Sequence, residues 1–457
     1  MKLNIQEITK CISGELINTS KDLIISGVST DSRKIKKGDL YIPLKGERYD
    51  GHSFVLQAIE AGAIATLWQE DIPLNDLTIP TILVPDTLEA MQNMASWYRQ
   101  LVNPIVIGVT GSNGKTTTKD LITATLVNKY RVHKTKGNLN NHIGVPLTLL
   151  NMSEDTDVAV IEMGMSNLGE IEKLSLIANP DIAVVTNIGE SHIEFLKTKE
   201  NIVKAKLEII KGLKEDGLVI LPGEEPLVKS FLAEHNLGKN IIWVGETDKN
   251  DFYPLQIKIN KTDGITFTDS LNDQYYLPLI GVHNVINALM AIKIAKQLSV
   301  KKQDIQDGLD NIELTGMRLE KIHAKNGALI LNDAYNSSPT SLKASLQLLD
   351  SFKQFKQKIA ILGDMLELGE NAELYHEEIG KVCAEINLDY LIVTGKLGKS
   401  IVKAAKENGL KEHKIKYFED INLIPEFILK NASSKAIILV KASRGIKLEM
   451  VVNQIRA

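Results

Sequence analysis

The stretch GVTGSNGKTT, residues 108–117, lies between an apolar run at 105–109 and a segment with helical periodicity at 116–129. A strand, a glycine-rich turn and a helix in this order present backbone N–H groups and a helix N-terminus to an anion. Lys115 would bring a positive charge to the β- and γ-phosphates of a nucleotide, and the Thr116 hydroxyl would reach Mg²⁺. The stretch therefore predicts a nucleotide-phosphate site.

The spacing of the glycines differs from that of the standard P-loop. That motif places a glycine five residues before Gly114, where this chain has Val109. The tighter form GxxGKTT, residues 111–117, remains. A structural glycine turn beside a surface lysine is the alternative, but the position between a strand and a helix favours the phosphate site.

Short apolar runs alternate with helical stretches on both sides of this turn. The central runs lie at 158–163, 182–187, 218–221 and 241–244, and a long helix is expected at 283–298. A second series begins near Gly316, with runs at 328–331, 359–362, 390–393 and 437–440. This alternation predicts an α/β fold with mostly parallel sheets covered by helices. We expect three domains, at 1–103, 104–313 and 314–457.

The overall composition is that of a soluble globular protein. Of 457 residues, 44% are hydrophobic and 24% charged, and the net charge of −4 indicates neither a nucleic-acid nor a membrane partner. Cys11 and Cys383 are far apart and fit no metal or redox spacing, so reduced thiols are expected. No signal-peptide core occurs at 1–10, and no apolar run approaches the roughly 20 residues of a membrane helix. We expect a cytoplasmic protein.

Two polar residues follow central strands. Glu162 ends an apolar run, where a carboxylate can hold Mg²⁺, although a solvent-facing glutamate fits the same pattern. His192 lies in a loop after the run at 184–187. Because imidazole is an unusual Mg²⁺ ligand, the bare sequence favours a surface role for His192.

Lys206 occupies an unusual position if residues 201–215 form a helix at about 100° per residue. It falls within an apolar stripe of Val203, Leu207, Ile210 and Leu213, opposite Lys204, Glu208, Lys211 and Glu215. Burial lowers the pKa of an ammonium, and the neutral amine can act as a nucleophile or take up CO₂ to form an anionic, metal-binding carbamate. A lysine whose ammonium reaches solvent along a buried stem is the alternative, and periodicity leaves both open.

The phosphate loop, Glu162, His192 and Lys206, in this order, resemble the Mur ligase family. Further motifs of that family are STDSR at 29–33, LKGERYDGH at 44–52, GNLNNHIGVP at 137–146, EMGM at 162–165, DAYN at 333–336 and LGDMLELG at 362–369. The resemblance covers nearly the whole chain and implies an N-terminal UDP-sugar domain, a central ATPase domain and a C-terminal Rossmann-like domain. The family often has Asn-Ala-Asn-Pro after the tyrosine, whereas this chain has NSSP at 336–339, so Ser338 is not carried over as a contact.

The resemblance also implies roles for individual residues. Lys115, Lys206 and His192 would be catalytic, with Thr116, Glu162, His192 and a carbamylated Lys206 around the metal. The expected nucleotide contacts are Gly111, Ser112, Asn113, Gly114, Lys115, Thr116, Thr117, Asn284, Asn287, Arg318 and Asp333. The expected muramoyl-substrate contacts are Asn138, Asn140 and Asn141 for the peptide and Ser29, Lys45, Gly46 and Glu47 for the uridine. Without the resemblance, each asparagine would be interpreted as a cap or turn residue.

The activity implied is that of an ATP- and Mg²⁺-dependent amide ligase. Its substrates would be UDP-N-acetylmuramoyl-tripeptide and D-alanyl-D-alanine, joined through an acyl phosphate by a monomeric protein. The family member that adds the third residue carries a DNPR-type stretch, which this chain lacks. A folylpolyglutamate synthetase would lack the N-terminal motifs, and a P-loop kinase would need neither the C-terminal domain nor this glycine spacing. A nucleotide-binding regulator without catalysis is the remaining alternative.

Overall fold

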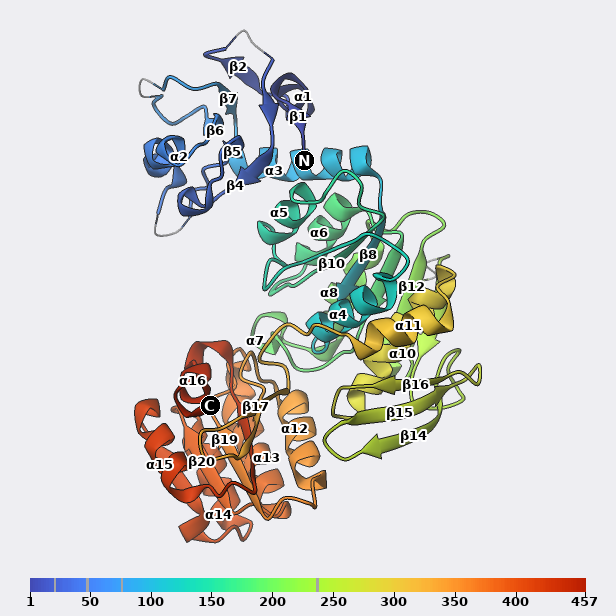
Figure 1. Cartoon of the computed structure of the whole chain (residues 1–457), viewed down its shortest axis with the longest axis vertical. Helices are drawn as coiled ribbons and strands as arrows, with labels where there is room; N and C mark the ends of the chain where they lie inside the picture. The colour runs from blue at the N-terminus through green and yellow to red at the C-terminus, as the bar shows by residue number, and fades with distance from the viewer. Residues whose placement is uncertain (20–21, 47–48, 75–76, 236–237) are drawn as a thin grey trace.

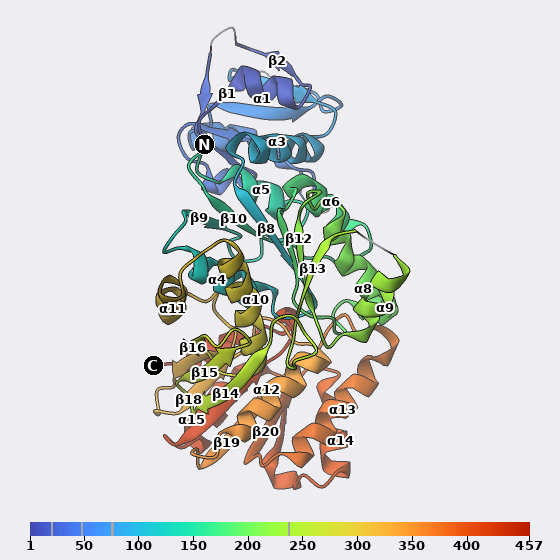
Figure 2. The same cartoon turned by 90° about the vertical axis from the view of Figure 1, so that its right-hand side faces the viewer.

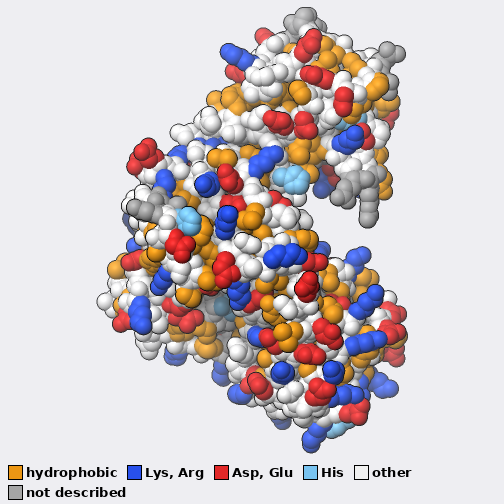
Figure 3. Space-filling view, turned by 180° about the vertical axis from the view of Figure 1, so that it is seen from behind, with side chains coloured by type: hydrophobic (Ala, Val, Ile, Leu, Met, Phe, Trp, Pro, Cys, Tyr) orange, Lys and Arg blue, Asp and Glu red, His pale blue; other side chains and the backbone are white. Residues whose placement is uncertain are grey.

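The computed structural model describes residues 1–19, 22–46, 49–74, 77–235 and 238–457. They form three successive α/β domains along the long axis of the molecule, with the N-terminal domain at one end and the C-terminal domain at the other (Figure 1). Figure 3 shows a deep indentation on one side, between these two end domains. No helix among the described residues is long and apolar enough to span a membrane.

The N-terminal domain contains a five-stranded sheet in the order β2-β7-β6-β5-β4 and a separate β1-β3 pair. Its strands are β1 Leu3–Asn4, β2 Glu15–Ile17, β3 Ile24–Ile25, β4 Gly27–Ser29, β5 Asp39–Tyr41, β6 Ala65–Gln69 and β7 Thr81–Val84, and its helices are α1 Ile5–Cys11, α2 Val55–Glu60 and α3 Thr87–Val102. α3 continues towards the central domain, so a single long helix leads from one sheet to the next.

The central domain is built on a six-stranded, all-parallel sheet in the order β13-β12-β11-β8-β10-β9. The strands are β8 Ile105–Thr110, β9 Val132–Lys134, β10 Val158–Glu162, β11 Ile182–Val185, β12 Leu218–Pro222 and β13 Asn240–Val244. The helices are α4 Lys115–Leu126, α5 Gly144–Leu150, α6 Glu170–Ala178, α7 Ile193–Leu196, α8 Lys199–Leu207, α9 Pro226–Glu234, α10 His283–Gln297 and α11 Lys302–Asp310. The predicted central strands are therefore present.

Both faces of this sheet are buried, which explains why its strands are continuous apolar runs. Along β10, Val158 and Val160 face the core beneath α4 and α10, whereas Ala159 and Ile161 face the opposite core. That opposite core extends without interruption into the N-terminal domain. On α3, Arg99 is buried and donates to the carbonyls of two residues at the end of α6, Ala178 and Asn179, each at 2.9 Å. The N-terminal and central domains are thus packed as one body.

The C-terminal domain has its own six-stranded sheet, in the order β17-β18-β22-β19-β20-β21, parallel except for the edge strand β17. The strands are β17 Glu320–His323, β18 Leu329–Asn332, β19 Gln357–Leu362, β20 Tyr390–Thr394, β21 Ile415–Phe418 and β22 Ala436–Lys441. The helices are α12 Pro339–Ser351, α13 Ala372–Glu385, α14 Gly398–Glu407, α15 Ile424–Asn431 and α16 Glu449–Ile455. They cover both faces of the sheet and bury a separate apolar core on each (Figure 2).

The segment that leads into the C-terminal domain is hydrogen-bonded to α4 at its start and has unusual backbone conformations further along. Thr315 donates its backbone N–H to Asp120 at 2.8 Å, and Lys119 reaches the Thr315 hydroxyl at 3.4 Å. Two and four residues further on, Met317 and Leu319 adopt φ values of 63° and 51°, which L-residues with bulky side chains rarely adopt. Such conformations persist where surrounding contacts hold them, and here they flank Arg318.

Two features differ from the sequence-based expectation. A three-stranded antiparallel sheet, β14 Pro254–Asn260, β15 Gly264–Asp269 and β16 Gln274–Leu277, precedes α10 and was not predicted. The helix expected at 201–215 ends at Leu207 and continues as a 3₁₀ turn, Glu208–Ile210. Glu208 was placed on the polar side but is buried, because its carboxylate accepts backbone N–H groups of Gly169 and Glu172 at 2.8 and 3.3 Å.

Candidate active site

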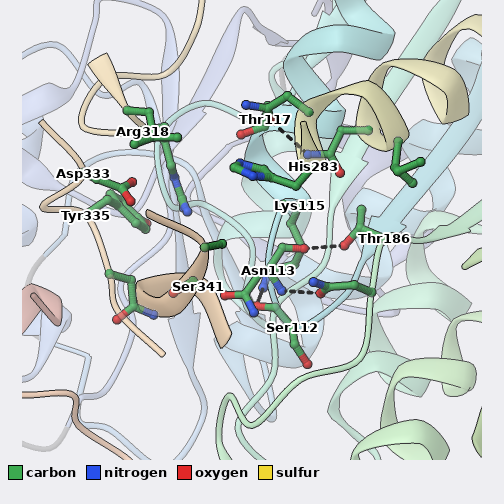
Figure 4. A pocket seen from close by; sticks show the side chains of 18 of the residues that line it. Ser112, Asn113, Lys115, Thr117, Thr186, His283, Arg318, Asp333, Tyr335 and Ser341 are labelled. Atoms are coloured by element: carbon green, nitrogen blue, oxygen red, sulfur yellow. Dashed lines mark hydrogen bonds between the residues drawn. The ribbon is translucent and has the colours of Figure 1, made fainter. Parts of the chain in front are cut away.

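The carboxyl ends of three neighbouring strands meet in the middle of the central sheet. β8 lies between β10 and β11, and in an open parallel sheet such ends flank the crevice where ligands bind. A cavity of about 890 Å³ opens there, lined by residues of both the central and the C-terminal domain. Figure 4 shows Ser112, Asn113 and Lys115 of the phosphate loop across from Arg318, Asp333 and Tyr335.

The phosphate loop is held in a conformation that requires glycine. Gly111 has a φ of 144°, and a Cβ at this position would collide with the Thr186 hydroxyl. The Asn113 backbone N–H donates to Asn187 Oδ1 at 2.7 Å, and the Thr186 hydroxyl donates to the Asn113 carbonyl at 2.5 Å. Because these partners come from the end of β11, the neighbouring strand fixes the shape of the loop. Gly114, at φ 79°, then begins α4.

Lys115 points back over this loop. Its Nζ donates to the carbonyls of Gly111 at 2.7 Å and Ser112 at 3.3 Å. Burial lowers the pKa of Lys115 to about 8, Glu162 opposes that shift, and Arg318 adds to it. The ammonium is therefore cationic at neutral pH and lies in a cavity rich in amides and hydroxyls, an environment suited to a phosphate group.

Glu162 ends β10 beside the loop and is buried. Its Oε1 accepts a hydrogen bond from the Asn140 amide at 2.8 Å, whereas its Oε2 is buried without a hydrogen-bond partner in the described part of the chain. An unsatisfied carboxylate oxygen at a cavity wall is costly unless a cation or donor completes it. The donor chemistry therefore fits Mg²⁺, which prefers oxygen ligands.

Lys206 is fully buried, and its Nζ has no hydrogen-bond partner among the residues that the structure describes. Burial lowers the pKa of this amine well below its usual value, and the nearby charge of Lys115 lowers it further, against a smaller opposing effect of Glu208. The ammonium therefore does not reach solvent, and the alternative of a lysine that extends to the surface along a buried stem is excluded. Because burial favours the neutral form of this amine, its environment has the chemistry required for carbamylation.

His192 also lines the cavity, at the start of α7. Its Nδ1 lies 2.6 Å from Oε2 of Glu367 in the C-terminal domain, close enough for an ion pair although the ring N–H is not aligned for a hydrogen bond. The backbone N–H of Glu194 donates to the Glu367 carbonyl at 3.2 Å, so the two loops are in contact. Among the described residues, no three His, Cys, Asp or Glu side chains lie close enough together to hold a metal ion. Glu162 and His192 therefore have no third described side chain of these types beside them that would complete a metal site.

Arg318 reaches across from the interdomain connection to the phosphate loop. Its Nη2 donates to the Thr116 hydroxyl at 3.1 Å, and its guanidinium lies 4.1 Å from the centre of the Tyr335 ring. Stacking on an aromatic face orients a guanidinium and stabilises its charge. Because Thr116 is buried at the start of α4, this contact couples the C-terminal side of the cavity to the phosphate loop.

The C-terminal wall includes one ion pair that the sequence interpretation missed. Lys441 is buried and donates to Asp333 at 2.6 Å and to the Asn336 carbonyl at 3.1 Å. The same Asp333 oxygen accepts from the Ser345 hydroxyl at 2.9 Å. The signal for Lys441 was available, since it ends the apolar strand β22 just as Glu162 ends β10.

The two asparagines of α10 are buried in the wall nearest the phosphate loop. Asn284 donates to the Ile280 carbonyl at 2.8 Å and accepts from Asn287 at 3.1 Å. A Cβ built on Gly114 would lie 3.0 Å from Asn287 Oδ1, so the loop approaches this side chain closely. Both asparagines and His283 line the cavity.

The expected muramoyl-peptide residues are only partly gathered at the cavity. Asn140 and Asn141 line it, but the Asn141 side chain accepts the backbone N–H groups of Ile143 at 3.2 Å and Gly144 at 2.9 Å. Asn138 is exposed outside it. The Asn141 side chain thus holds the turn that leads into α5.

The residues expected to bind uridine lie apart from the cavity, in the N-terminal domain. Ser29 ends β4, Lys45 is exposed, and the Gly46 backbone N–H donates to the Tyr49 carbonyl at 2.9 Å. None of these described residues lines the large cavity. Glu47 lies outside the described residues.

Replacing Arg318 with alanine is expected to raise the KM for ATP by about 10-fold, the effect of one lost hydrogen bond to a charged group. The thermal midpoint of unfolding should stay unchanged, because Arg318 lines a cavity and its truncation removes no packing from a buried core. Steady-state kinetics and thermal melting would test this, with exposed Arg131→Ala as the matched control. Unchanged kinetics in Arg318→Ala would contradict the role.

Three family models match the chain in succession. The Mur ligase family catalytic domain matches residues 24–99, the Mur ligase middle domain matches 109–295, and the Mur ligase glutamate ligase domain matches 317–444. The chain belongs to the Mur ligase family.

Full-length relatives narrow the comparison to one member of that family. The chain is 46% identical to the UDP-N-acetylmuramoyl-tripeptide–D-alanyl-D-alanine ligase of Bacillus subtilis, over 100% of this chain and 98% of the relative. The Escherichia coli ligase of the same name is 32% identical, over 100% and 99%. A crystal structure of MurF from Acinetobacter baumannii matches with a TM-score of 0.88 at 28% identity, over 99% of this chain and 98% of that one. The MurF ligase of Thermotoga maritima, solved in complex with ADP, matches with a TM-score of 0.80 at 28% identity, over 94% and 96%.

Proposed function

We propose that this protein is an ATP-dependent amide ligase that joins D-alanyl-D-alanine to UDP-N-acetylmuramoyl-tripeptide, which yields the UDP-muramoyl-pentapeptide precursor of peptidoglycan. The observation that carries the proposal is a single cavity in which the phosphate loop faces Arg318 and Asp333 of the C-terminal domain. Full-length similarity to ligases of that name, at up to 46% identity among those described above, supports the choice of substrates. We propose domain limits of 1–103, 104–313 and 314–457.

We further propose that the nucleotide and metal occupy this cavity together. Mg²⁺, when bound, would offset negative charge on the β- and γ-phosphates, and Glu162, Thr116, His192 and a carbamylated Lys206 are its proposed protein contacts. The unpartnered Oε2 of Glu162 supports this assignment. Asn284 and Asn287 would contact the adenine, and Asp333 the ribose.

Catalysis would rest on positioning and on electrostatic stabilisation. The terminal carboxylate of the tripeptide attacks the γ-phosphate of ATP, the bond to the β-phosphate oxygen breaks, and ADP leaves. Lys115 stabilises the charge that develops during this transfer, and Arg318 adds a second cation from the C-terminal side. The neutral amine of D-alanyl-D-alanine then attacks the acyl carbon, and inorganic phosphate leaves as the amide forms.

The muramoyl substrate would extend from this cavity towards the N-terminal domain. Asn138, Asn140 and Asn141 are proposed to contact its peptide, and Ser29, Lys45, Gly46 and Glu47 its uridine. We also propose that the protein acts as a monomer in the cytoplasm, where ATP and the UDP-linked precursor are available.

Release of phosphate from ATP, measured with defined substrate pairs, tests the proposal. We expect release to require both UDP-N-acetylmuramoyl-tripeptide and D-alanyl-D-alanine, with one amide bond formed for each phosphate. Release that instead requires UDP-muramoyl-dipeptide and a diamino acid would identify the ligase that adds the third residue. Release with neither pair would contradict the proposal.

A further inference from the structure

The N-terminus of α12 lies directly on the phosphate loop, although it belongs to the C-terminal domain. The Ser338 hydroxyl caps α12 by accepting the Ser341 backbone N–H at 3.4 Å, and it lies 3.1 Å from Asn113 Oδ1. Asn113 is the residue whose backbone is fixed by Thr186 and Asn187. One serine therefore joins a helix of the C-terminal domain to the segment that would hold the nucleotide phosphates.

A second contact is made one residue into the helix. The Thr340 hydroxyl donates to Glu190 Oε2 at 2.5 Å, while Glu190 Oε1 pairs with Lys199 at 2.8 Å. Glu190 is 8% exposed, and Lys199 belongs to the central domain. The carboxylate is thus already oriented by its own domain and presents one oxygen to the C-terminal domain.

The segment that carries Glu190 is itself bonded to the phosphate loop. The Ser112 hydroxyl donates to the Gly189 carbonyl at 3.2 Å, and the Ser191 hydroxyl donates to the Ser112 carbonyl at 3.3 Å. Ser338 and Thr340 therefore contact two segments of the central domain that are hydrogen-bonded to each other. A purely structural cap would need neither contact, because Ser338 and Ser341 already complete the capping box of α12.

We propose that Ser338 and Thr340 are positioning residues that seat the C-terminal domain on the phosphate loop, with Asn113 and Glu190 as their receiving groups, and that this seating keeps water from the acyl phosphate. The inference rests on the proposed function, because it concerns the intermediate of that reaction. If water reaches the intermediate, it attacks the acyl phosphate, and the tripeptide carboxylate and inorganic phosphate are released without an amide bond. Loss of seating would therefore uncouple ATP consumption from ligation.

The test compares Thr340→Val, Glu190→Gln and their double variant with the unchanged protein. Thr340→Val keeps the shape of the side chain and removes the hydroxyl, and Glu190→Gln removes the charge. We expect each single variant to lower kcat by about 10-fold, the equivalent of one charge-assisted hydrogen bond, with little change in the KM for ATP. The double variant should lose little more than either single one, because both remove the same contact.

The decisive readout is the number of phosphates released per amide bond formed. This ratio should stay near one in the unchanged protein and rise in the variants. Ser338→Ala should raise it as well, and Ser338→Thr, which keeps the hydroxyl, should restore it. Ser351→Ala, at the exposed far end of the same helix, is the matched control and should behave like the unchanged protein.

Small-angle scattering with a non-hydrolysable ATP analogue supplies a measurement that does not depend on turnover. The unchanged protein should become more compact with the analogue and Mg²⁺, and Thr340→Val should respond less. Folded variants with an unchanged ratio and unchanged scattering would overturn the proposal, as would an equal effect of Ser351→Ala. If the protein proves to use a different substrate pair, the ratio of phosphate released to amide bonds formed can be measured with that pair. An error in the substrate assignment can therefore be distinguished from an error in the proposed role of Ser338 and Thr340.

Discussion

Lys115→Met lowers kcat by about 10²–10³-fold in our expectation, with the fold intact. The magnitude is that of removing one preorganised electrostatic stabiliser from an active site. Methionine matches the lysine stem in length, and among the described residues the Lys115 ammonium donates only to carbonyls of its own loop, at Gly111 and Ser112. Steady-state kinetics and circular dichroism would measure the two effects. Exposed Lys136→Met, which keeps full activity if the effect is specific, is the control.

The pH dependence of the unchanged protein provides an independent check on Lys115. Its pKa is lowered to about 8 by burial, so the side chain is cationic below that pH and neutral above it. The kcat/KM for ATP, which reports on the free protein, should therefore decline as the pH rises through about 8. This decline should be absent from the residual activity of Lys115→Met. A profile that is flat to pH 9 would contradict the role of the ammonium.

Lys206→Met should abolish ligation almost completely, with a loss of at least about 10²-fold in kcat. The amine is fully buried without a hydrogen-bond partner among the described residues, and burial strongly lowers its pKa, so a lysine at this position indicates a chemical role and not a packing role. Methionine would fit that setting, and the thermal midpoint should not fall. Lys211→Met, on the exposed side of the same segment, is the matched control.

Carbamylation itself can be observed directly. We expect ¹³C-labelled bicarbonate to give a carbamate signal in the unchanged protein and none in Lys206→Met. Activity should fall when CO₂ is removed and return when bicarbonate is restored. Full activity of Lys206→Met, or the same labelling in both proteins, would show that the buried amine has another role.

The core strands were predictable from the sequence because both faces of each strand are buried. Residues such as Val158 and Ala159 face different cores, so the runs are apolar throughout and their ends are sharp. The strand β14 was not predictable in this way. Leu255, Ile257 and Ile259 alternate with polar residues but remain exposed, and no long apolar run marks the strand.

The site was predictable where a residue's position in a local pattern carries its chemistry. Lys115 stands at a strand–turn–helix junction, and helical periodicity placed Lys206 within an apolar stripe, although it left open whether the ammonium reaches solvent. Contacts between domains have no such local signal. Glu367 meets His192 across more than 170 residues of chain, and only the packed structure brings the two loops together. The role expected for His192 came from the family resemblance alone.

The two interdomain junctions differ in kind. A helix with the buried Arg99 and a shared apolar core join the first two domains, whereas a short connection with Met317 and Leu319 in left-handed conformations leads to the third. The C-terminal domain also has two apolar cores made mainly of its own residues, although Ile280 of the central domain joins one of them. It is therefore a module that evolution or protein engineering could exchange as a unit. A chimera would have to keep Ser338, Thr340 and the connection with Arg318, and also Asp333 with Lys441, for the exchanged domain to complete the same cavity.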